Sequence, residues 1–489
     1  MTRAHAVSSR SDKLPLALKL GYASGQMVDG VVTNTLNIFL LFYLTAVCGM
    51  PGALAGAALS AGLIVDALMD PLIGSVSEAW RSRLGRRLPF MLVGAPAVSV
   101  VFVLIFWLPE GLSSTALFLW VALLSILLRV SMSLFILPYQ AVGAEISDDM
   151  RERSSLVAWR WGLGIIGALI AALLGFGVFF SGPKGLSQRD AYLPFAASLV
   201  AIVALGTLAS AWAVAATRSR QHAAPMSTAS TMGRLRTELA EVFRNRSFCV
   251  LFAGAVLFFV ALGVHGSLTL HANTFFWQLT PSQTKQVTLS MFVGLLFGAP
   301  LAGPLLARLE KRTVLMIGMV GLALSMGVPA ALRLLGLLGA TGDTLALGLS
   351  LAVFAGAMLM AAAAISFGSM MADAADEHEH LFAARREGLY FAGWAFAGKA
   401  ASGGGTLVAG LVLQLIAFPT GVAQQGAAAA ALPHSTSAML GFWYGPGASL
   451  LIFTSVIITL MYRLDSRAHA VILSELRSRR ADVASAPAA

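Results

Sequence analysis

Long apolar stretches separated by short polar segments run along almost the whole chain. Each stretch holds about 20 residues or more, the length that an α-helix needs to cross a bilayer. The pattern predicts an all-α membrane protein with twelve spanning helices, six on either side of a polar segment. The predicted spans are 18–47, 52–77, 88–108, 113–142, 156–180, 192–216, 247–275, 286–308, 313–338, 344–371, 387–416 and 437–462.

Composition agrees with a polytopic membrane protein. The 489 residues are 57% hydrophobic and only 11% charged, and the mean hydropathy is +0.80. A soluble globular protein is usually about one quarter charged. The first span lacks a small-residue cleavage site, so we expect a retained helix instead of a signal peptide. Cys48 and Cys249 lie in different halves and suggest neither a disulfide nor a metal framework.

The net charge of +10 has a topological explanation. With an even number of spans both termini lie on one side, and that side holds 26 of the 33 lysines and arginines. The opposite side holds Lys184, Arg189 and Lys285. This asymmetry predicts cytoplasmic termini and a cytoplasmic (inner) membrane location. The basic residues therefore require no nucleic-acid partner.

The chain divides into a six-helix bundle at 1–216, a linker at 217–246, a second bundle at 247–463 and a tail at 464–489. A short surface helix is expected within the linker. The halves resemble each other, because 70–94 has a counterpart in 299–318 and 143–160 has one in 371–389. Two parallel six-helix repeats around a central cavity are typical of the major facilitator fold.

Asp66 and Asp70 lie one helical turn apart inside an otherwise apolar span. Their spacing places both carboxylates on one helix face. A charge at the centre of a bilayer costs about 2.5–3.5 kcal/mol even on the mildest scale, and two like charges also repel. We therefore expect the pair to bind a cation, a proton or a buried basic side chain. The second repeat lacks this feature, since Ala299 stands where Asp70 does.

Other polar residues within the spans are candidates for a central cavity. They are Gln26, Asp29, Thr33, Ser125, Arg129, Ser133, Gln140, Arg160, His265 and Lys399. Asp29 is a candidate for substrate binding, with helix packing as the alternative. Lys399 is too deep to reach the interface, so pairing with Asp66, Asp70 or Asp29 is the simplest way to keep it charged. Arg129 points along the same helix face as Ser133, so its guanidinium could replace the cation as a permanent partner of one carboxylate.

Charged residues recur at the cytoplasmic helix ends of both halves. They are Glu145, Arg151, Arg153, Asp373, Asp376, Arg385 and Arg386. Solvated loop charges are the simple interpretation. Because the pattern repeats, we favour a network of ion pairs that holds an inner gate shut, each exposed pair contributing about 0–1 kcal/mol.

Three separated motifs resemble the glycoside–pentoside–hexuronide:cation symporters of the major facilitator superfamily. The first is IVDALMDPLIG with RSRLGRRLPF, the second LPYQAVGAEISDDMRERSSLVAWR, and the third MMADAADEHEHLFAARREGLYFAGWAFAGKAASGGGTLVAG. The resemblance implies a major facilitator fold and sodium- or proton-coupled uptake of a sugar, with no cofactor beyond the coupling ion. Related lysolipid symporters indicate that the substrate need not be a sugar.

Carried over residue by residue, the resemblance makes Asp66 and Asp70 the cation-site carboxylates, with Ser133 as a neighbouring hydroxyl and Lys399 as the family lysine. Asp29 matches a sugar-binding position, and Arg160 resembles an arginine of many members. Two positions depart from the melibiose permease pattern. Ile136 replaces a sugar-binding aspartate and Gln140 replaces a tryptophan, which argues against melibiose-like galactosides.

The sequence thus predicts a monomeric cation:substrate symporter for a sugar or glycoside, with membrane lipid as its surroundings. Asp29, Gln140, Arg160 and His265 are the predicted substrate-binding residues. A carrier of lysolipids or other amphiphiles is the alternative within transport. A polytopic membrane enzyme is disfavoured, because the sequence contains no metal-ligand cluster and no phosphate-binding glycine loop.

Overall fold

The structure, a computed structural model, describes residues 14–147, 149–182, 185–218, 240–384, 386–422 and 432–485. Within these ranges the chain is helical and contains no strand. The first half comprises α1 (Leu16–Ala23), α2 (Gly25–Thr35), α3 (Gly52–Ala79), α4 (Leu88–Phe106), α5 (Ser114–Glu145), α6 (Met150–Leu174) and α7 (Tyr192–Ala216). The second comprises α9 (Arg246–His271), α10 (Pro281–Arg308), α11 (Lys311–Leu334), α12 (Gly342–Phe382), α13 (Glu387–Leu415), α14 (His434–Phe442), α15 (Ala448–Thr459) and α16 (Ser466–Ser485).

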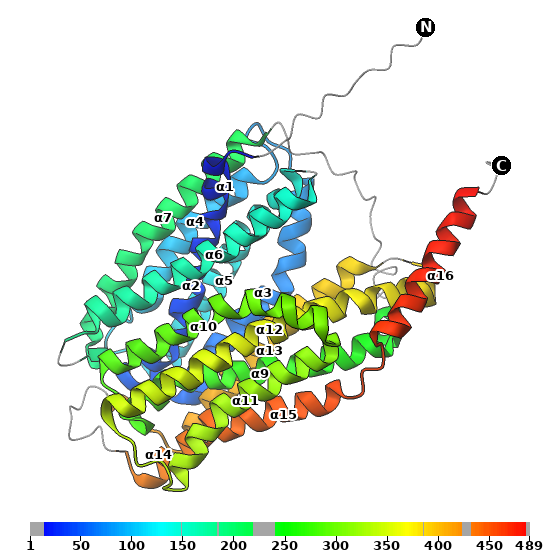
Figure 1. Ribbon diagram of the computed structural model, residues 1–489. Helices are drawn as coiled ribbons and strands as arrows, with labels where there is room; N and C mark the ends of the chain where they lie inside the picture. Colours follow the sequence, from blue (N-terminus) through cyan, green and yellow to red (C-terminus); the bar gives the residue numbers. More distant parts are fainter. Residues whose placement is uncertain are drawn as a thin grey trace.

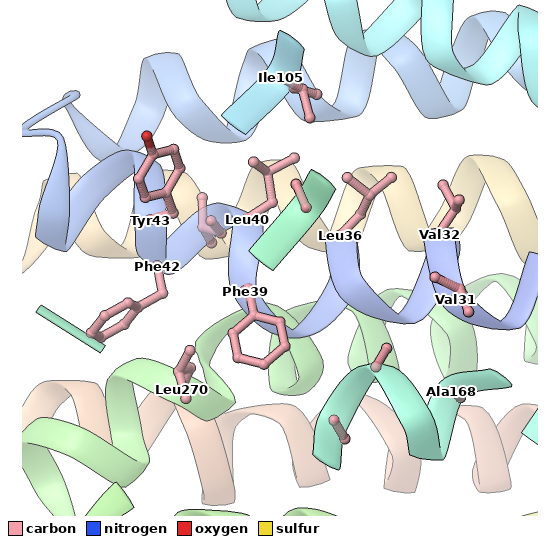
Figure 2. Packing of buried hydrophobic residues seen from close by; sticks show 14 of the residues in the cluster. Val31, Val32, Leu36, Phe39, Leu40, Phe42, Tyr43, Ile105, Ala168 and Leu270 are labelled. Atoms are coloured by element: carbon pink, nitrogen blue, oxygen red, sulfur yellow. The ribbon is translucent and has the colours of Figure 1, made fainter. Parts of the chain in front are cut away.

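The first predicted span is one helical path built from short pieces. A turn at Ser24 separates α1 from α2, and two π-helical turns, η1 (Leu36–Leu40) and η2 (Tyr43–Val47), complete it. Its apolar side chains enter the main core, where Leu40 points toward Ile105 of α4 and Phe39 points to the opposite side (Figure 2). This path therefore anchors the residues that it presents to the centre of the molecule.

Eleven further helical segments in the described ranges are long and apolar enough to cross a membrane. Together with the Leu16–Val47 path they match the twelve predicted spans. The largest difference is at α12, which continues to Phe382 beyond the apolar part at 344–371. Alanine, glutamate and histidine tolerate helix, and α16 packs against this extension.

The helices form two bundles, α1–α7 and α9–α15, that separate toward the end bearing both termini (Figure 1). At the opposite end the bundles touch closely. Thr45 Oγ1 lies 2.8 Å from His271 Nε2, and the Gly421 amide donates to the Thr45 carbonyl oxygen at 3.0 Å. The structure is thus closed at the end where residues 45–52 lie.

Candidate functional site

A cavity of about 490 Å³ lies between the bundles. Helices of both halves line it, and more than half of the lining residues are polar. These polar residues are Asp29, Thr33, Asn37, Asp66, Asp70, Arg129, Ser133, Gln140, Ser267, Lys399, Ser402 and Thr406. The cavity therefore gathers side chains that are far apart in the sequence.

Lys399 of α13 contacts both aspartates of α3. Its Nζ lies 2.9 Å from Asp66 Oδ2 and 2.5 Å from Asp70 Oδ2. The side chain of Asp66 is 5% exposed and that of Asp70 is 19% exposed. One ammonium group thus serves two carboxylates, which leaves this cluster with one net negative charge at ordinary ionisation.

Ser133 of α5 completes the cluster. Its Oγ lies 2.6 Å from Asp66 Oδ1 and 2.7 Å from Asp70 Oδ1. A hydroxyl carries one hydrogen, so it donates to only one carboxylate at a time. The second short contact becomes a hydrogen bond when the other carboxyl carries a proton of its own. The cluster is therefore chemically suited to take up one positive charge.

Small residues allow α3 and α13 to approach closely enough for these contacts. Ser60 Oγ donates to the Gly403 carbonyl oxygen at 2.5 Å. A Cβ at Gly410 would collide with the Gly52 carbonyl oxygen, and a Cβ at Gly403 would lie 2.9 Å from Leu63 Cβ. Only glycine fits at such separations, because each added carbon would push the helices apart. We call this contact between α3 and α13 the glycine seam.

Asp29 belongs to a second polar chain at the cavity wall. Its carboxylate accepts hydrogen bonds from Gln26 Nε2 at 2.9 Å and from Thr33 Oγ1 at 2.8 Å. Arg160 of α6 donates to Gln26 Oε1 at 3.1 Å and lies over the Tyr139 ring. Arg160 is not a cavity-lining residue, so it acts on Asp29 through Gln26.

Arg129 does not occupy the position that the sequence suggested. Lys399 already binds Asp66 and Asp70, and the guanidinium of Arg129 forms no ion pair or hydrogen bond with any residue that the structure describes. It lines the cavity instead. In this conformation the glycine seam brings the lysine of α13, and not Arg129, within reach of both carboxylates, and pairing of Arg129 with a carboxylate stays a prediction.

Two other predicted substrate residues differ in their positions. Gln140 is exposed and lines the cavity. His265 does not line it, because its Nδ1 lies 2.8 Å from the Tyr444 carbonyl oxygen and its ring stacks on Tyr444. Packing between α9 and the α14–α15 segment holds the His265 ring away from the cavity in this conformation, and a role of His265 in substrate binding stays a prediction.

Sequence reasoning missed four polar lining residues: Asn37, Ser267, Ser402 and Thr406. Asn37 follows Thr33 by four residues and extends the polar face of the first span, so its spacing could have revealed it. The hydroxyl residues carry no such signal, because serine and threonine within apolar helices commonly bond to their own backbone. Ser267 Oγ instead donates to Thr406 Oγ1 at 3.2 Å.

The charged residues at the predicted cytoplasmic ends pair within their own halves. Glu145 binds Arg86 at 3.3 Å and Arg87 at 3.2 Å. Asp373 binds Lys311 at 2.7 Å, and Asp376 lies 3.1 Å from Nε2 of His469.

The remaining predicted gate residues are arginines near the ends of α6 and α13. Arg153 Nε donates to the Ser147 carbonyl oxygen at 2.5 Å, and Arg151 is exposed. Arg386 precedes α13, whereas Arg385 lies outside the described residues, as does most of the predicted linker helix. A network that joins the halves at this end stays a prediction.

Several known proteins resemble this chain. An uncharacterized symporter of Synechocystis is 32% identical over 203 residues, which cover 40% of this chain and 37% of that protein. The inner membrane symporter YicJ of Escherichia coli is 25% identical over 297 residues, covering 60% of this chain and 62% of YicJ. The sodium-dependent lysophosphatidylcholine symporter 1 of Mus musculus is 30% identical over 169 residues, which cover 34% of this chain and 32% of the mouse protein. Each alignment spans less than two thirds of the relative.

The fold is shared with solved transporters. The crystal structure of the nucleoside transporter NupG matches with a TM-score of 0.60 at 18% identity, covering 92% of this chain and 99% of NupG. This likeness confirms the predicted major facilitator fold. Residues 21–466, nearly the whole chain, match the family described as MFS/sugar transport protein. The chain therefore belongs to the MFS/sugar transport protein family, whose members are transporters and not enzymes.

Proposed function

We propose that this protein is a cation:substrate symporter that takes up a sugar or glycoside by alternating access. The observation that carries the proposal is the Asp66–Asp70–Ser133–Lys399 cluster at the wall of a cavity shared by both halves. Buried charges in membrane proteins mark ion pathways and coupling sites.

The cluster suggests how coupling works. In the absence of an ion, Lys399 neutralises one of the two carboxylate charges and holds α13 against α3. A sodium ion bound by the oxygens of Asp66, Asp70 and Ser133 would displace the ammonium group. A proton on one carboxyl would instead weaken the attraction between that carboxyl and the ammonium group. Either event changes the contact between the two halves, and so links ion binding to the movement of one bundle against the other.

The lining of the cavity supports a hydroxyl-rich substrate. Asp29 and Gln140 of the first half face Ser267 and Thr406 of the second across the same space. Side chains of this kind give hydrogen bonds to several hydroxyls at once. More of the lining surface is apolar than polar, so the argument for the sugar rests on the number of hydrogen-bonding side chains that the cavity offers. Because the mouse relative is named a lysophosphatidylcholine symporter, a lysolipid is the alternative substrate that the uptake experiment must include.

The orientation is also a proposal. The excess of lysine and arginine on one side supports cytoplasmic termini in an inner membrane. The bundles separate toward the termini (Figure 1), so with this orientation the conformation is inward-facing. We propose a monomer as the working unit, because the cavity is built within a single chain.

Uptake into proteoliposomes tests the function. Sodium and pH gradients are imposed separately, with a panel of radiolabelled sugars and with lysophosphatidylcholine. We expect one gradient to drive accumulation of a sugar above equilibrium, and no accumulation of the lysolipid. Equal inside and outside concentrations of every sugar under both gradients would overturn the proposal. Among the described residues the Asp343 carboxylate accepts a side-chain hydrogen bond only from Gln283 Nε2, at 2.9 Å. Asp343→Asn is therefore a control that should keep wild-type uptake.

A further inference from the structure

A narrow extension of about 40 Å³ leads from the central cavity toward the closed end. Leu40 and Leu41 line its far part, just before Thr45, whose contact with His271 closes that end. Seven of its twelve lining residues are leucine or isoleucine, and none of these described residues is acidic. A water molecule in the liquid occupies about 30 Å³. The extension therefore has room for one small ion and not for a sugar ring.

Three hydrogen-bond donors line the extension without a protein partner. The Arg129 guanidinium forms no ion pair or hydrogen bond with any described residue. Ser125, one turn earlier on α5, is only 5% exposed, and its Oγ has no hydrogen-bond partner in the described part of the chain. The side-chain amide of Asn37 also has none among the residues that the structure describes. Because buried donors are normally paired, these groups indicate an acceptor that the protein does not supply.

The acidic side chains of the neighbouring cavity are held elsewhere. Asp66 and Asp70 share Lys399, and Asp29 accepts two hydrogen bonds from its own helix. None of these carboxylates lies within ion-pair distance of Arg129. Water in the extension would satisfy hydrogen bonds but would leave the guanidinium charge uncompensated between apolar walls. An anion from outside the protein supplies both the acceptor and the charge.

We propose that Arg129, Ser125 and Asn37 bind one small inorganic anion, such as chloride, in the extension. The guanidinium balances the charge of the anion, and the hydroxyl and the amide complete its hydrogen bonds. The apolar walls strengthen this charge pair, because they lower the local dielectric constant. The anion is a free ion that binds without any sugar in the main cavity.

The anion also gives the proposed symport a way to keep the site neutral. The charged side chains of the site are three carboxylates and three cations: Asp29, Asp66, Asp70, Arg129, Lys399 and the Gln26-linked Arg160. A coupling cation bound with a neutral sugar adds one positive charge, which is costly within a bilayer. One monovalent anion returns the sum to zero, so the cation and the anion favour each other's binding reciprocally. This role rests on the proposed function, whereas the binding site rests on the geometry.

Line broadening of the chloride NMR signal by the purified full chain, in detergent and without sugar, tests the site. Bound chloride should broaden the signal. Bromide should reverse the broadening by competition, whereas methanesulfonate, which is too bulky for the extension, should not. Arg129→Gln should abolish the broadening that bromide reverses. Ser125→Ala should lower the chloride affinity about two- to tenfold, as expected for the loss of one hydrogen bond.

Two further variants separate the site from a folding defect. Arg333→Gln removes an arginine that lies over Phe276 and Trp277 and does not line the extension, so it should keep wild-type chloride binding. Arg129→Lys should keep a weaker site, since the charge remains but the fork of donors is lost. If Arg129→Gln does not fold, the Ser125→Ala and Arg129→Lys variants still decide.

Uptake into proteoliposomes measures the role of the anion separately. Chloride replaces methanesulfonate on both sides of the membrane, at constant ionic strength and with a neutral sugar. The concentration of coupling cation that half-saturates uptake should fall several-fold in chloride. Arg129→Gln should make this concentration independent of chloride, whereas Arg333→Gln should keep the wild-type response.

The possible results distinguish the site, its role and the proposed function. No chloride binding without sugar, or binding unchanged in both the Arg129 and Ser125 variants, would overturn the site. Chloride binding as described, with uptake independent of chloride, would overturn only the role in symport. Chloride binding without gradient-driven uptake of any sugar would overturn the proposed function and leave the site standing.

Discussion

Helices α3 and α10 occupy equivalent places in the two repeats, yet they make opposite contacts. Two glycines of α3, Gly52 and Gly56, face the other half and meet Gly410 of α13, whereas Gly62 packs on Ser125 of α5 in its own half. The glycines of α10 face their own half, where Gly294 and Gly298 meet α12. Asp66 and Asp70 are on α3, whereas Leu295 and Ala299 hold the corresponding positions of α10.

The difference shows how a duplicated helix acquires a coupling role. On α3 the tight contact and the charges coincide, so a change in charge acts directly on the junction between the halves. On α10 the tight contacts of Gly294 and Gly298 lie within its own bundle, and the contacts of α10 with α6 of the first half carry no pair equivalent to Asp66 and Asp70. The account predicts that the two helices respond unequally to matched substitutions.

The largest effect is expected from Lys399→Met. The change leaves Asp66 and Asp70 side by side without their ammonium partner, and removing one member of a buried charge group costs about 3–5 kcal/mol. Thermal unfolding in detergent should detect this loss, and Asp70→Asn added to Lys399→Met should restore much of it. Lys285→Met on α10 is the matched control. A Lys399→Met protein as stable as wild type would break the comparison.

A smaller loss of stability is expected when a carboxylate is placed on α10. Ala299→Asp recreates the position of Asp70 where no lysine is positioned to bind it, so the free energy of unfolding should fall by about 2.5–3.5 kcal/mol. Expression level and thermal unfolding measure the effect. Wild-type stability of Ala299→Asp would mean that either repeat accepts an acid within its apolar span.

The glycine seam gives a prediction about packing. Gly410→Val introduces carbons that collide with Gly52, and overpacking costs about 1–3 kcal/mol. The seam lies at the closed end, so Gly410→Val should open that end. A cysteine placed at Ser60 of the Gly410→Val protein should then react with a membrane-impermeant thiol reagent. Gly303 on α10 is the control, because an added Cβ there meets no atom within 4 Å. Gly303→Val should change neither the stability of the protein nor the reactivity of the cysteine. An unreactive cysteine in the Gly410→Val protein would exclude this role for the seam.

Sequence reasoning located the helices well, because bilayer length and hydropathy determine them directly. It also singled out Asp66, Asp70 and Lys399, since a charge inside an apolar span is conspicuous. The surroundings of Arg129 and His265 were harder to predict, because those of Arg129 depend on how the two bundles meet and those of His265 on how α9 packs against the α14–α15 segment. The repeat pattern gave no information on which basic side chain contacts the aspartates, because Lys399 lies 329 residues after Asp70 in the sequence.

The smallest effect is expected from Ser133→Ala. The hydroxyl contributes one hydrogen bond, and the net contribution of a typical hydrogen bond is about 0.5–1.5 kcal/mol, so its loss should weaken ion binding by about that amount. The ion concentration that half-saturates uptake should rise, while the maximal rate changes little. Ser131→Ala is the control on the same helix, because Ser131 Oγ donates only to the Leu127 carbonyl oxygen. An unchanged half-saturation for Ser133→Ala would remove the serine from the ion site.

The central claim is that Asp66 and Asp70 couple ion binding to transport. Its most direct test is uptake by Asp66→Asn and Asp70→Asn in proteoliposomes, comparing gradient-driven accumulation with exchange of internal for external substrate. Both variants should lose accumulation while keeping part of the exchange, because the amide holds no added ion but the cavity remains. Normal gradient-driven accumulation by both variants would contradict the claim.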